Sequence, residues 1–254
     1  MSITTHTSGG VATIEIARPQ KRNALTIEMY EAMTAAIAQA LADAGVRALV
    51  ITGQPGVFTA GNDLEDLMQR PPDNTDAPVP RFMQALRTCD KPVIAAVTGV
   101  AIGIGVTLLL HCDLVYVSAE ARLTMPFVSL GLVPEFGSSL LLPRLIGRVR
   151  AAEKLLLGEP LSGAEAVELG IANAVLPADQ VLSHARHMAE RFNALPPAAV
   201  RDTKRLMRAG LEAQVTRALE AEGAVFAERV RSAEATEAFQ AFFEKRKPDF
   251  SRFG

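Results

Sequence analysis

Residues 91–105, with the sequence KPVIAAVTGVAIGIG, join an uninterrupted apolar run to a glycine-rich loop. The run Val93–Val97 predicts a buried strand, because it contains no polar side chain. The residues that follow the loop, Val106–Cys112, favour a helix. A strand, a glycine-rich loop and a helix in succession are typical of an α/β fold, and a helix N-terminus after such a loop can receive an anion.

Alternating strand and helix patterns continue on both sides of this stretch. Strands are predicted at Val11–Ile16, Val46–Thr52, Asp113–Ser118 and, after a turn, within Gly170–Val175. Helices are predicted at about Ile27–Asp43, Arg81–Thr88, Ser139–Leu145, Arg150–Leu157 and Leu211–Val230, and the capping box Ser162–Glu165 opens another. Thr26 is the expected N-cap of the first helix, and the proline-rich segment Gln69–Pro80 is the expected mobile loop. Residues after 178 are almost entirely helical in pattern, which predicts an α/β core followed by a helical lobe.

The composition excludes several classes of protein. The chain has 254 residues, 49% of them hydrophobic, and a formal net charge of −2. These values exclude disorder as the main state and argue against a general nucleic-acid or anionic-membrane binder. The most apolar stretch is interrupted by glycines, His111 and Asp113, so it does not form a membrane span. Two widely spaced cysteines and the lack of an apolar signal segment predict a soluble cytoplasmic protein.

The loop after Val97 matches a dinucleotide-binding fingerprint only in part. In Gly103–Leu108 a leucine takes the place of the third glycine, and the first strand of the chain lacks the fingerprint as well. A nicotinamide cofactor is therefore not expected.

A second loop with chemical potential is Phe58–Leu64, with the sequence FTAGNDL. Its small residues let a backbone come close to a ligand, and its N–H groups could bind an oxyanion. The simpler interpretation is an ordinary turn, in which Asp63 holds the loop or caps a helix running through Met68. The residues alone leave both interpretations open.

Glu135 is the candidate group for proton transfer. It lies in an apolar window, and a carboxyl in apolar surroundings has a raised pKa that suits proton transfer near neutral pH. The alternative interpretation is a glutamate at a helix N-terminus ahead of Ser138 and Ser139.

Other conspicuous side chains are interpreted as structural. His111 is expected to be a satisfied core histidine rather than a metal ligand. A basic helix face is expected to be solvated; it comprises Arg201, Lys204, Arg205 and Arg208. The chain has no P-loop, no nucleophile elbow and no His-rich metal motif.

Taken in order, these segments resemble the crotonase (enoyl-CoA hydratase/isomerase) superfamily from Thr13 to about Phe250. The motifs that carry the resemblance are RPQKRNAL at 18–25, FTAGNDL at 58–64, KPVIAAVTG at 91–99, CD at 112–113, GLVP at 131–134, SGAEA at 162–166, Gly170 and FFEKRKP at 242–248. Each motif is short, but the ordered set is highly specific.

The resemblance implies an α/β fold in which repeated ββα turns form a crotonase-like spiral core with the acyl-CoA site, placed at residues 1–195. Residues 196–254 would form a C-terminal helical lobe that drives assembly into a homotrimer or a dimer of trimers. The implied substrate is an acyl-CoA thioester. Coenzyme A is then part of the substrate, and no cofactor, metal, nucleic acid or membrane is expected as a further partner.

The resemblance also implies roles for individual residues. The backbone N–H groups of Asn62 and Ile104 would hold the thioester oxygen and stabilise an enolate, with Glu135 as the catalytic base. Lys245 would reach the nucleotide phosphates. The residues expected to bind the substrate are Lys21, Ala24, Leu25, Ala60, Gly61, Asp63, Leu64, Gly103, Phe127, Phe136 and Lys245.

Two departures from the family pattern bear on the reaction. Hydratases of the family use two glutamates, and the matching positions here hold Thr107 and Phe127, neither of which can accept a proton. The loops instead resemble those of peroxisomal-type Δ3,Δ2-enoyl-CoA isomerases, in which the residue matching Glu135 is the sole base. Epoxyphenylacetyl-CoA isomerases, with an aspartate there, are also similar.

We therefore expect an enoyl-CoA isomerase that shifts a double bond from the 3- to the 2-position. The alternatives are an enoyl-CoA hydratase acting on 2-enoyl-CoA and a non-catalytic crotonase-fold binding protein. The sequence does not give the acyl chain length or ring preference, which depend on the 69–80 loop and on apolar residues such as Phe82.

Overall fold

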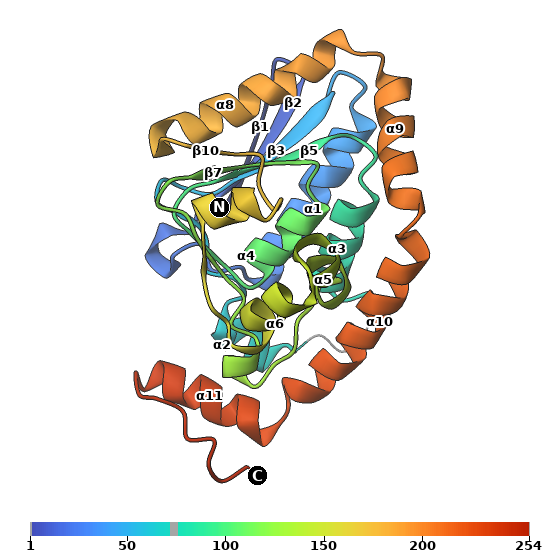
Figure 1. Ribbon diagram of the computed structural model, residues 1–254. Coiled ribbons are helices and arrows are strands. Elements are labelled where there is room, and N and C mark those ends of the chain that lie inside the picture. Colours follow the sequence, from blue (N-terminus) through green and yellow to red (C-terminus); the bar gives the residue numbers. More distant parts are fainter. Residues whose placement is uncertain (1, 72–75, 254) are drawn as a thin grey trace.

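The computed structural model describes residues 2–71 and 76–253, and a six-stranded sheet runs through its upper half (Figure 1). The strand order is β1-β2-β3-β5-β7-β10, and only the β1–β2 pair is antiparallel. The bounds are β1 (Ile3–Ser8), β2 (Val11–Ile16), β3 (Ala48–Thr52), β5 (Val93–Val97), β7 (Leu114–Ser118) and β10 (Ala174–Leu176). Both β3 and β5 are buried along their whole length, as their apolar sequences predict.

A second, four-stranded sheet has the order β4-β6-β8-β9. Its strands are β4 (Val57–Thr59), β6 (Val100–Ile102), β8 (Arg122–Thr124) and β9 (Leu161–Ser162). Each of β4, β6 and β8 directly follows β3, β5 or β7 of the first sheet, so each turn of the chain adds one strand to each sheet. This repetition stacks the turns as a spiral.

Helices cover the sheets and extend beyond them. The α-helices are α1 (Ile27–Ala42), α2 (Leu64–Gln69), α3 (Pro78–Thr88), α4 (Ile104–Thr107), α5 (Ser138–Ile146), α6 (Arg148–Leu156), α7 (Gly163–Glu168), α8 (Ala178–Glu190), α9 (Pro197–Ala209), α10 (Glu212–Arg229) and α11 (Ala233–Phe243). The 3-10 helices are η1 (Pro19–Lys21), η2 (Leu108–His111), η3 (Val128–Leu130) and η4 (Arg191–Ala194). Among the described residues, no helix is long and apolar enough to cross a membrane.

The six-stranded sheet separates two apolar cores. On one face, Val50 and Ile94 pack with Val181 of α8. On the other face, Leu49, Ile51 and their neighbours join a larger cluster that includes the buried sides of α1 and α3. Because successive strand residues alternate between the faces, both faces of β3 and β5 must be apolar.

The C-terminal helices α9, α10 and α11 follow the right side and lower end of the molecule in Figure 1. The basic face of α9 was expected to be solvated, and for Lys204 this was wrong. Its ammonium is buried and donates to the carbonyl of Lys91 and to Asp113, both at 2.6 Å. Arg208 donates to the carbonyls of Arg87, Cys89 and His111. These contacts dock α9 on the core.

Most predicted elements lie where the sequence places them, but the four strands of the second sheet (β4, β6, β8 and β9) were not predicted, because strands of two or three residues give no periodic signal. Three further differences concern the loop 69–80, the cap of α1 and strand β1. The predicted loop 69–80 contains the end of α2 and the start of α3, and its residues 72–75 lie outside the described residues. Thr26 is the N-cap of α1, but its side chain makes no capping bond; the N–H of Ile27 donates to Asp66 instead, at 2.7 Å. Strand β1 was not predicted, because it is a mostly exposed, polar edge strand. The division at residue 195 stays a prediction.

We predict that Gly99→Ala destabilises the fold by at least about 2 kcal/mol. Gly99 has φ +66°, and a Cβ there would lie 1.9 Å from the carbonyl oxygen of Gly56 in the preceding turn of the spiral. Urea unfolding measures the effect. Gly56→Ala is the matched control, because Gly56 also has a positive φ (+81°) but no heavy atom within 4 Å of its Cβ position. Equal losses of unfolding free energy in the two variants would contradict the close packing of Gly99 against Gly56.

Candidate active site

The two loops singled out in the sequence lie side by side. Strands β4 and β6 pair in parallel, with Thr59 opposite Ala101, and each strand leads into one loop. A Cβ at Gly61, where φ is +85°, would lie 2.8 Å from the carbonyl oxygen of Ile102. The absence of a side chain at Gly61 therefore permits the close contact between the loops.

Each loop offers a backbone donor. Ile104 is the first residue of α4, whose N–H has no carbonyl partner within the helix. The N–H of Asn62 lies between two residues that bond to Leu25: Leu25 donates to the carbonyl of Gly61, and Asp63 donates to the carbonyl of Leu25. Among the described residues, neither Asn62 nor Ile104 uses its N–H in a hydrogen bond to the protein.

Asp63 anchors the first loop. Its carboxylate accepts from the N–H groups of Glu65 and Asp66 and so caps α2, as the turn interpretation predicted. It also pairs with Arg18 at 2.6 Å. These hydrogen bonds and the Arg18 guanidinium, opposed by burial, hold the pKa of Asp63 below its ordinary value. The side chain is thus occupied within the protein.

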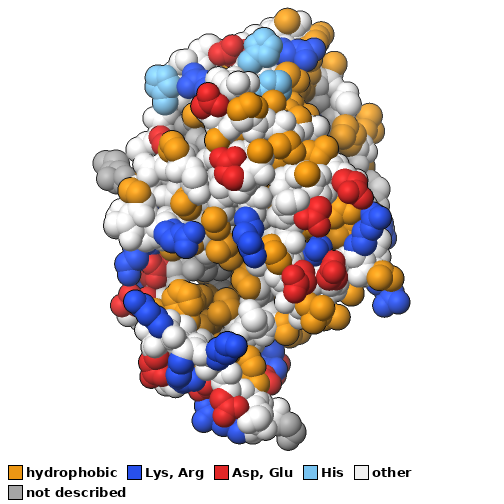
Figure 2. Space-filling view, turned by 60° about the vertical axis from the view of Figure 1, so that its left-hand side comes forward, with side chains coloured by type: hydrophobic (Ala, Val, Ile, Leu, Met, Phe, Trp, Pro, Cys, Tyr) orange, Lys and Arg blue, Asp and Glu red, His pale blue; other side chains and the backbone are white. Residues whose placement is uncertain are grey.

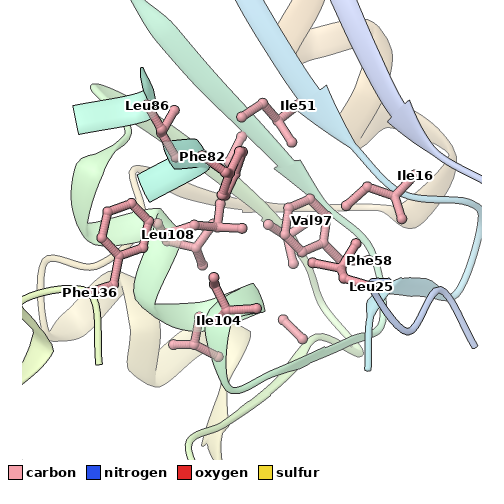
Figure 3. Close-up of a cluster of buried hydrophobic side chains, with 14 of the residues drawn as sticks. Ile16, Leu25, Ile51, Phe58, Phe82, Leu86, Val97, Ile104, Leu108 and Phe136 are labelled. Carbon is pink, nitrogen blue, oxygen red and sulfur yellow. The ribbon is translucent and has the colours of Figure 1, made fainter. Parts of the chain in front are cut away.

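A series of contacts between aromatic rings connects the first loop with the segment that carries Glu135. The buried hydroxyl of Tyr30 donates to the side-chain oxygen of Asn62. The Tyr30 ring lies 5.4 Å from that of Phe82, which lies 6.5 Å from that of Phe136. Figure 3 shows Phe82 and Phe136 within the buried cluster that also holds Ile104. Packing therefore couples the positions of the two segments.

Glu135 is a buried carboxyl with one hydrogen bond. Its side chain is only 6% exposed, and its Oε1 accepts from the Thr107 hydroxyl at 2.6 Å. Its Oε2 has no hydrogen-bond partner among the described residues. Burial raises the pKa of Glu135 to about 8; the Thr107 hydrogen bond opposes this shift and the charge of Glu222 adds to it.

The residue after Glu135 adopts an uncommon backbone conformation. Phe136 has φ +59°, and its carbonyl bonds to Nε2 of His111 at 2.7 Å. The His111 ring stacks on the Phe136 ring with 4.0 Å between centroids. Burial lowers the pKa of His111 to about 4, so the ring is neutral near pH 7 and can donate to this carbonyl. The expectation of a satisfied core histidine is confirmed.

Glu222 of α10 holds the same segment from the other side. Its carboxylate accepts from the N–H of Gly137 at 2.6 Å and from the N–H and hydroxyl of Ser139 at 2.9 and 2.5 Å. These groups belong to the start of α5, where a carboxylate is favourable to the helix dipole. The sequence reasoning missed Glu222, because 87 positions separate it from Glu135 and its helix pattern gives no signal.

A cavity of about 430 Å³ opens beside the first loop. Its walls come from α1, α2, the start of α3 and the link between α10 and α11, and they include Leu25, Tyr30, Asn62 and Asp63. Figure 2 shows a hollow with hydrophobic side chains inside it and Lys and Arg side chains on its rim. Glu135 does not line this cavity, although packing through Tyr30 and Phe82 connects the two.

The structure brings together only part of the predicted set. Leu25, Asn62 and Asp63 line the cavity. The residues gathered around the two loops and the buried cluster are Ala24, Ala60, Gly61, Leu64, Gly103, Ile104, Phe127, Glu135 and Phe136. Lys21 lies exposed in η1, and Lys245 lies exposed after α11; within residues 2–71 and 76–253, the Lys245 side chain forms no hydrogen bond or ion pair with the site. Their predicted roles remain predictions.

The arrangement can support proton transfer beside a developing negative charge. A buried carboxyl with a pKa near neutrality can take up and return a proton, and two free N–H groups can stabilise an oxyanion. In residues 2–71 and 76–253, no three His, Cys, Asp or Glu side chains are grouped to hold a metal ion.

Comparisons with known proteins agree on one family. The model of the enoyl-CoA hydratase/isomerase family matches residues 6–252. A probable enoyl-CoA hydratase of Bacillus subtilis is 32% identical, over 94% of this chain and 95% of its own. The 1,2-epoxyphenylacetyl-CoA isomerase of Escherichia coli is 34% identical over 98% of both chains. The structure of Pseudomonas aeruginosa OdaA superposes with a TM-score of 0.93 at 51% identity, covering 95% of this chain and 98% of its own.

We predict that Glu222→Gln lowers the pKa of Glu135, because it removes a nearby negative charge. It should also reduce the free energy of unfolding by about 2 kcal/mol, since the amide nitrogen of glutamine cannot accept a hydrogen bond from the N–H groups of Gly137 or Ser139. NMR titration of labelled glutamate and urea unfolding measure the two effects. Glu220→Gln, at an exposed position on α10, is the control. An unchanged Glu135 titration would show that Glu222 has no electrostatic influence on the site.

Proposed function

Because the chain belongs to the enoyl-CoA hydratase/isomerase family, whose members act on CoA thioesters, we propose that it converts a 3-enoyl-CoA to a 2-enoyl-CoA with Glu135 as the single base. The superposition with solved structures of this family confirms the expected α/β spiral fold with C-terminal helices. The observation that carries the proposal is the buried Glu135 carboxyl, whose raised pKa suits reversible proton transfer.

The proposed reaction moves one proton and one double bond. The Glu135 carboxylate removes a proton from the α-carbon, and the electron pair spreads over the thioester as a dienolate. The N–H groups of Asn62 and Ile104 stabilise the thioester oxygen as it gains negative charge. Glu135, now protonated, returns the proton to the γ-carbon, so the double bond lies between the α- and β-carbons. No water is consumed, and no cofactor beyond the coenzyme A of the substrate is required.

The surroundings of Glu135 support isomerisation over hydration. Hydration needs a second group to activate water. Thr107 instead donates its hydroxyl to Glu135, and Phe127 is apolar and buried. The partnerless Oε2 of Glu135 is the oxygen available to take the substrate proton. Curated relatives bear both hydratase and isomerase names, so hydratase activity is the competing outcome in the experiment below.

We propose that the active form is a homotrimer or a dimer of trimers. Several large apolar side chains are exposed on α5, α6 and α9: Leu145, Val149, Leu156, Leu206 and Met207. Burying such side chains between subunits would remove them from water, which favours association. Two free cysteines support the proposed cytoplasmic location.

We predict that Glu135→Gln reduces isomerisation of a 3-enoyl-CoA by at least about 1,000-fold, because the amide cannot accept the α-proton. Binding of a saturated acyl-CoA should persist, as measured by calorimetry. Hydration of a 2-enoyl-CoA is assayed in parallel, and Glu120→Gln, in an exposed turn, is the control. Retained isomerisation by Glu135→Gln would remove Glu135 from the mechanism, and faster hydration than isomerisation in the unmodified protein would favour the hydratase.

We predict that kcat/KM for isomerisation rises with pH to a midpoint near the Glu135 pKa of about 8, because the base must be deprotonated in the free enzyme. Thr107→Val should move this midpoint to higher pH, since the Thr107 hydrogen bond favours the carboxylate. The pH dependence of both proteins measures the shift. A profile already at its plateau at about pH 6 would contradict a raised pKa for the catalytic base.

A further inference from the structure

The cavity beside Asn62 is more charged than an apolar acyl chain requires. Among the described residues, four charged side chains line it: Asp63, Asp66, Arg70 and Arg231. Apolar residues such as Leu25 and Val79 form the rest of the wall. The balance of charge within the cavity therefore depends on which of these groups already have partners.

Three of the four charged groups are neutralised within the protein. Asp63 pairs with Arg18 at 2.6 Å. Asp66 pairs with Arg70, which also contacts Glu28 at 2.8 Å. The second oxygen of Asp66 accepts the N–H of Ile27. These groups form a closed network that needs no ligand.

Arg231 is different. It follows α10, and its side chain makes one hydrogen bond among the described residues, from Nη1 to the carbonyl of Ala227 at 2.6 Å. Two acidic residues lie three positions from it: Glu234 is paired with Arg229 at 2.9 Å, and Glu228 forms no ion pair with Arg231. Among the described residues, Arg231 therefore has no carboxylate partner, and most of its donors remain available in the cavity wall.

We propose that Arg231 binds a carboxylate at the far end of the acyl group, so that the substrate class includes enoyl-CoA thioesters with a terminal carboxylate. This inference rests on the proposed function, because it places the thioester oxygen at the N–H of Asn62, a residue that lines the same cavity as Arg231. The α- to γ-carbons then lie at the loop of Asn62 on the side of Glu135, and only the far end of the acyl group enters the cavity, past Leu25 and Val79, to reach the guanidinium. A planar guanidinium suits a carboxylate because it can donate two parallel hydrogen bonds.

The phosphates of coenzyme A are the other anions that could reach Arg231. They are present in every CoA substrate, whereas a terminal carboxylate is present in only some. A matched pair of substrates therefore distinguishes the two sources: 3-hexenoyl-CoA and 3-hexenedioyl-CoA differ only in the carboxylate that replaces the terminal methyl group.

The experiment compares kcat/KM for this pair in the unmodified protein and in Arg231→Gln. In Arg231→Gln, we expect kcat/KM for the dicarboxylic substrate, divided by kcat/KM for the monocarboxylic substrate, to fall about tenfold. Arg217→Gln removes a positive charge from an exposed position on α10 that does not line the cavity, and it should leave the ratio unchanged. An unchanged ratio in Arg231→Gln, or an equal loss with both substrates, overturns the proposal; the equal loss would assign Arg231 to the CoA phosphates.

A binding experiment separates this inference from the proposed reaction. Adipoyl-CoA and hexanoyl-CoA are the saturated counterparts of the two substrates and cannot isomerise. Calorimetry should show that Arg231→Gln reduces the affinity for adipoyl-CoA about tenfold more than the affinity for hexanoyl-CoA. If neither unsaturated substrate is isomerised, the proposed function fails, while the binding measurement still decides the role of Arg231. Equal affinities of the variant and the unmodified protein for adipoyl-CoA would overturn the carboxylate site at Arg231.

Discussion

The burial of one carboxyl group constrains the rest of this molecule. Removing Glu135 from water opposes its ionisation, and among the described residues only the hydroxyl of Thr107 compensates with a hydrogen bond. A carboxyl held in this way must be positioned by the backbone around it, since its side chain has almost no polar contacts. The structure meets this need on both sides of the Glu135 segment.

His111 and Glu222 supply that positioning. One binds the carbonyl of Phe136 and the other binds the N–H groups of Gly137 and Ser139. The positive φ of Phe136 is thus supported by polar bonds and by stacking. Because Glu222 belongs to α10, the C-terminal helices hold the segment of Glu135 as well as covering the core. Lys204 and Arg208 strengthen the same attachment through α9.

The spiral of paired strands solves a different problem, that of bringing two backbone donors together. Parallel pairing of β4 and β6 places the loops after them at one edge, and glycine at position 61 lets them approach. Donors of this kind need small neighbours rather than particular side chains. The same first loop forms one wall of the cavity that Arg231 also lines, so the two proposed sites, for the oxyanion and for the acyl end, share residues.

The sequence by itself determined the α/β class, the strands of the first sheet other than β1, most of the long helices, the two glycine loops and Glu135 as the candidate base. Each depends on local composition or periodicity, which can be recognised within a short window of one sequence. Only the tertiary structure decided the burial and partner of Glu135, the role of Glu222, the burial of Lys204 and the lack of a carboxylate partner for Arg231 among the described residues. These features arise between segments that lie up to 113 positions apart. A charged residue looks the same in a sequence whether it is solvated or paired in the core.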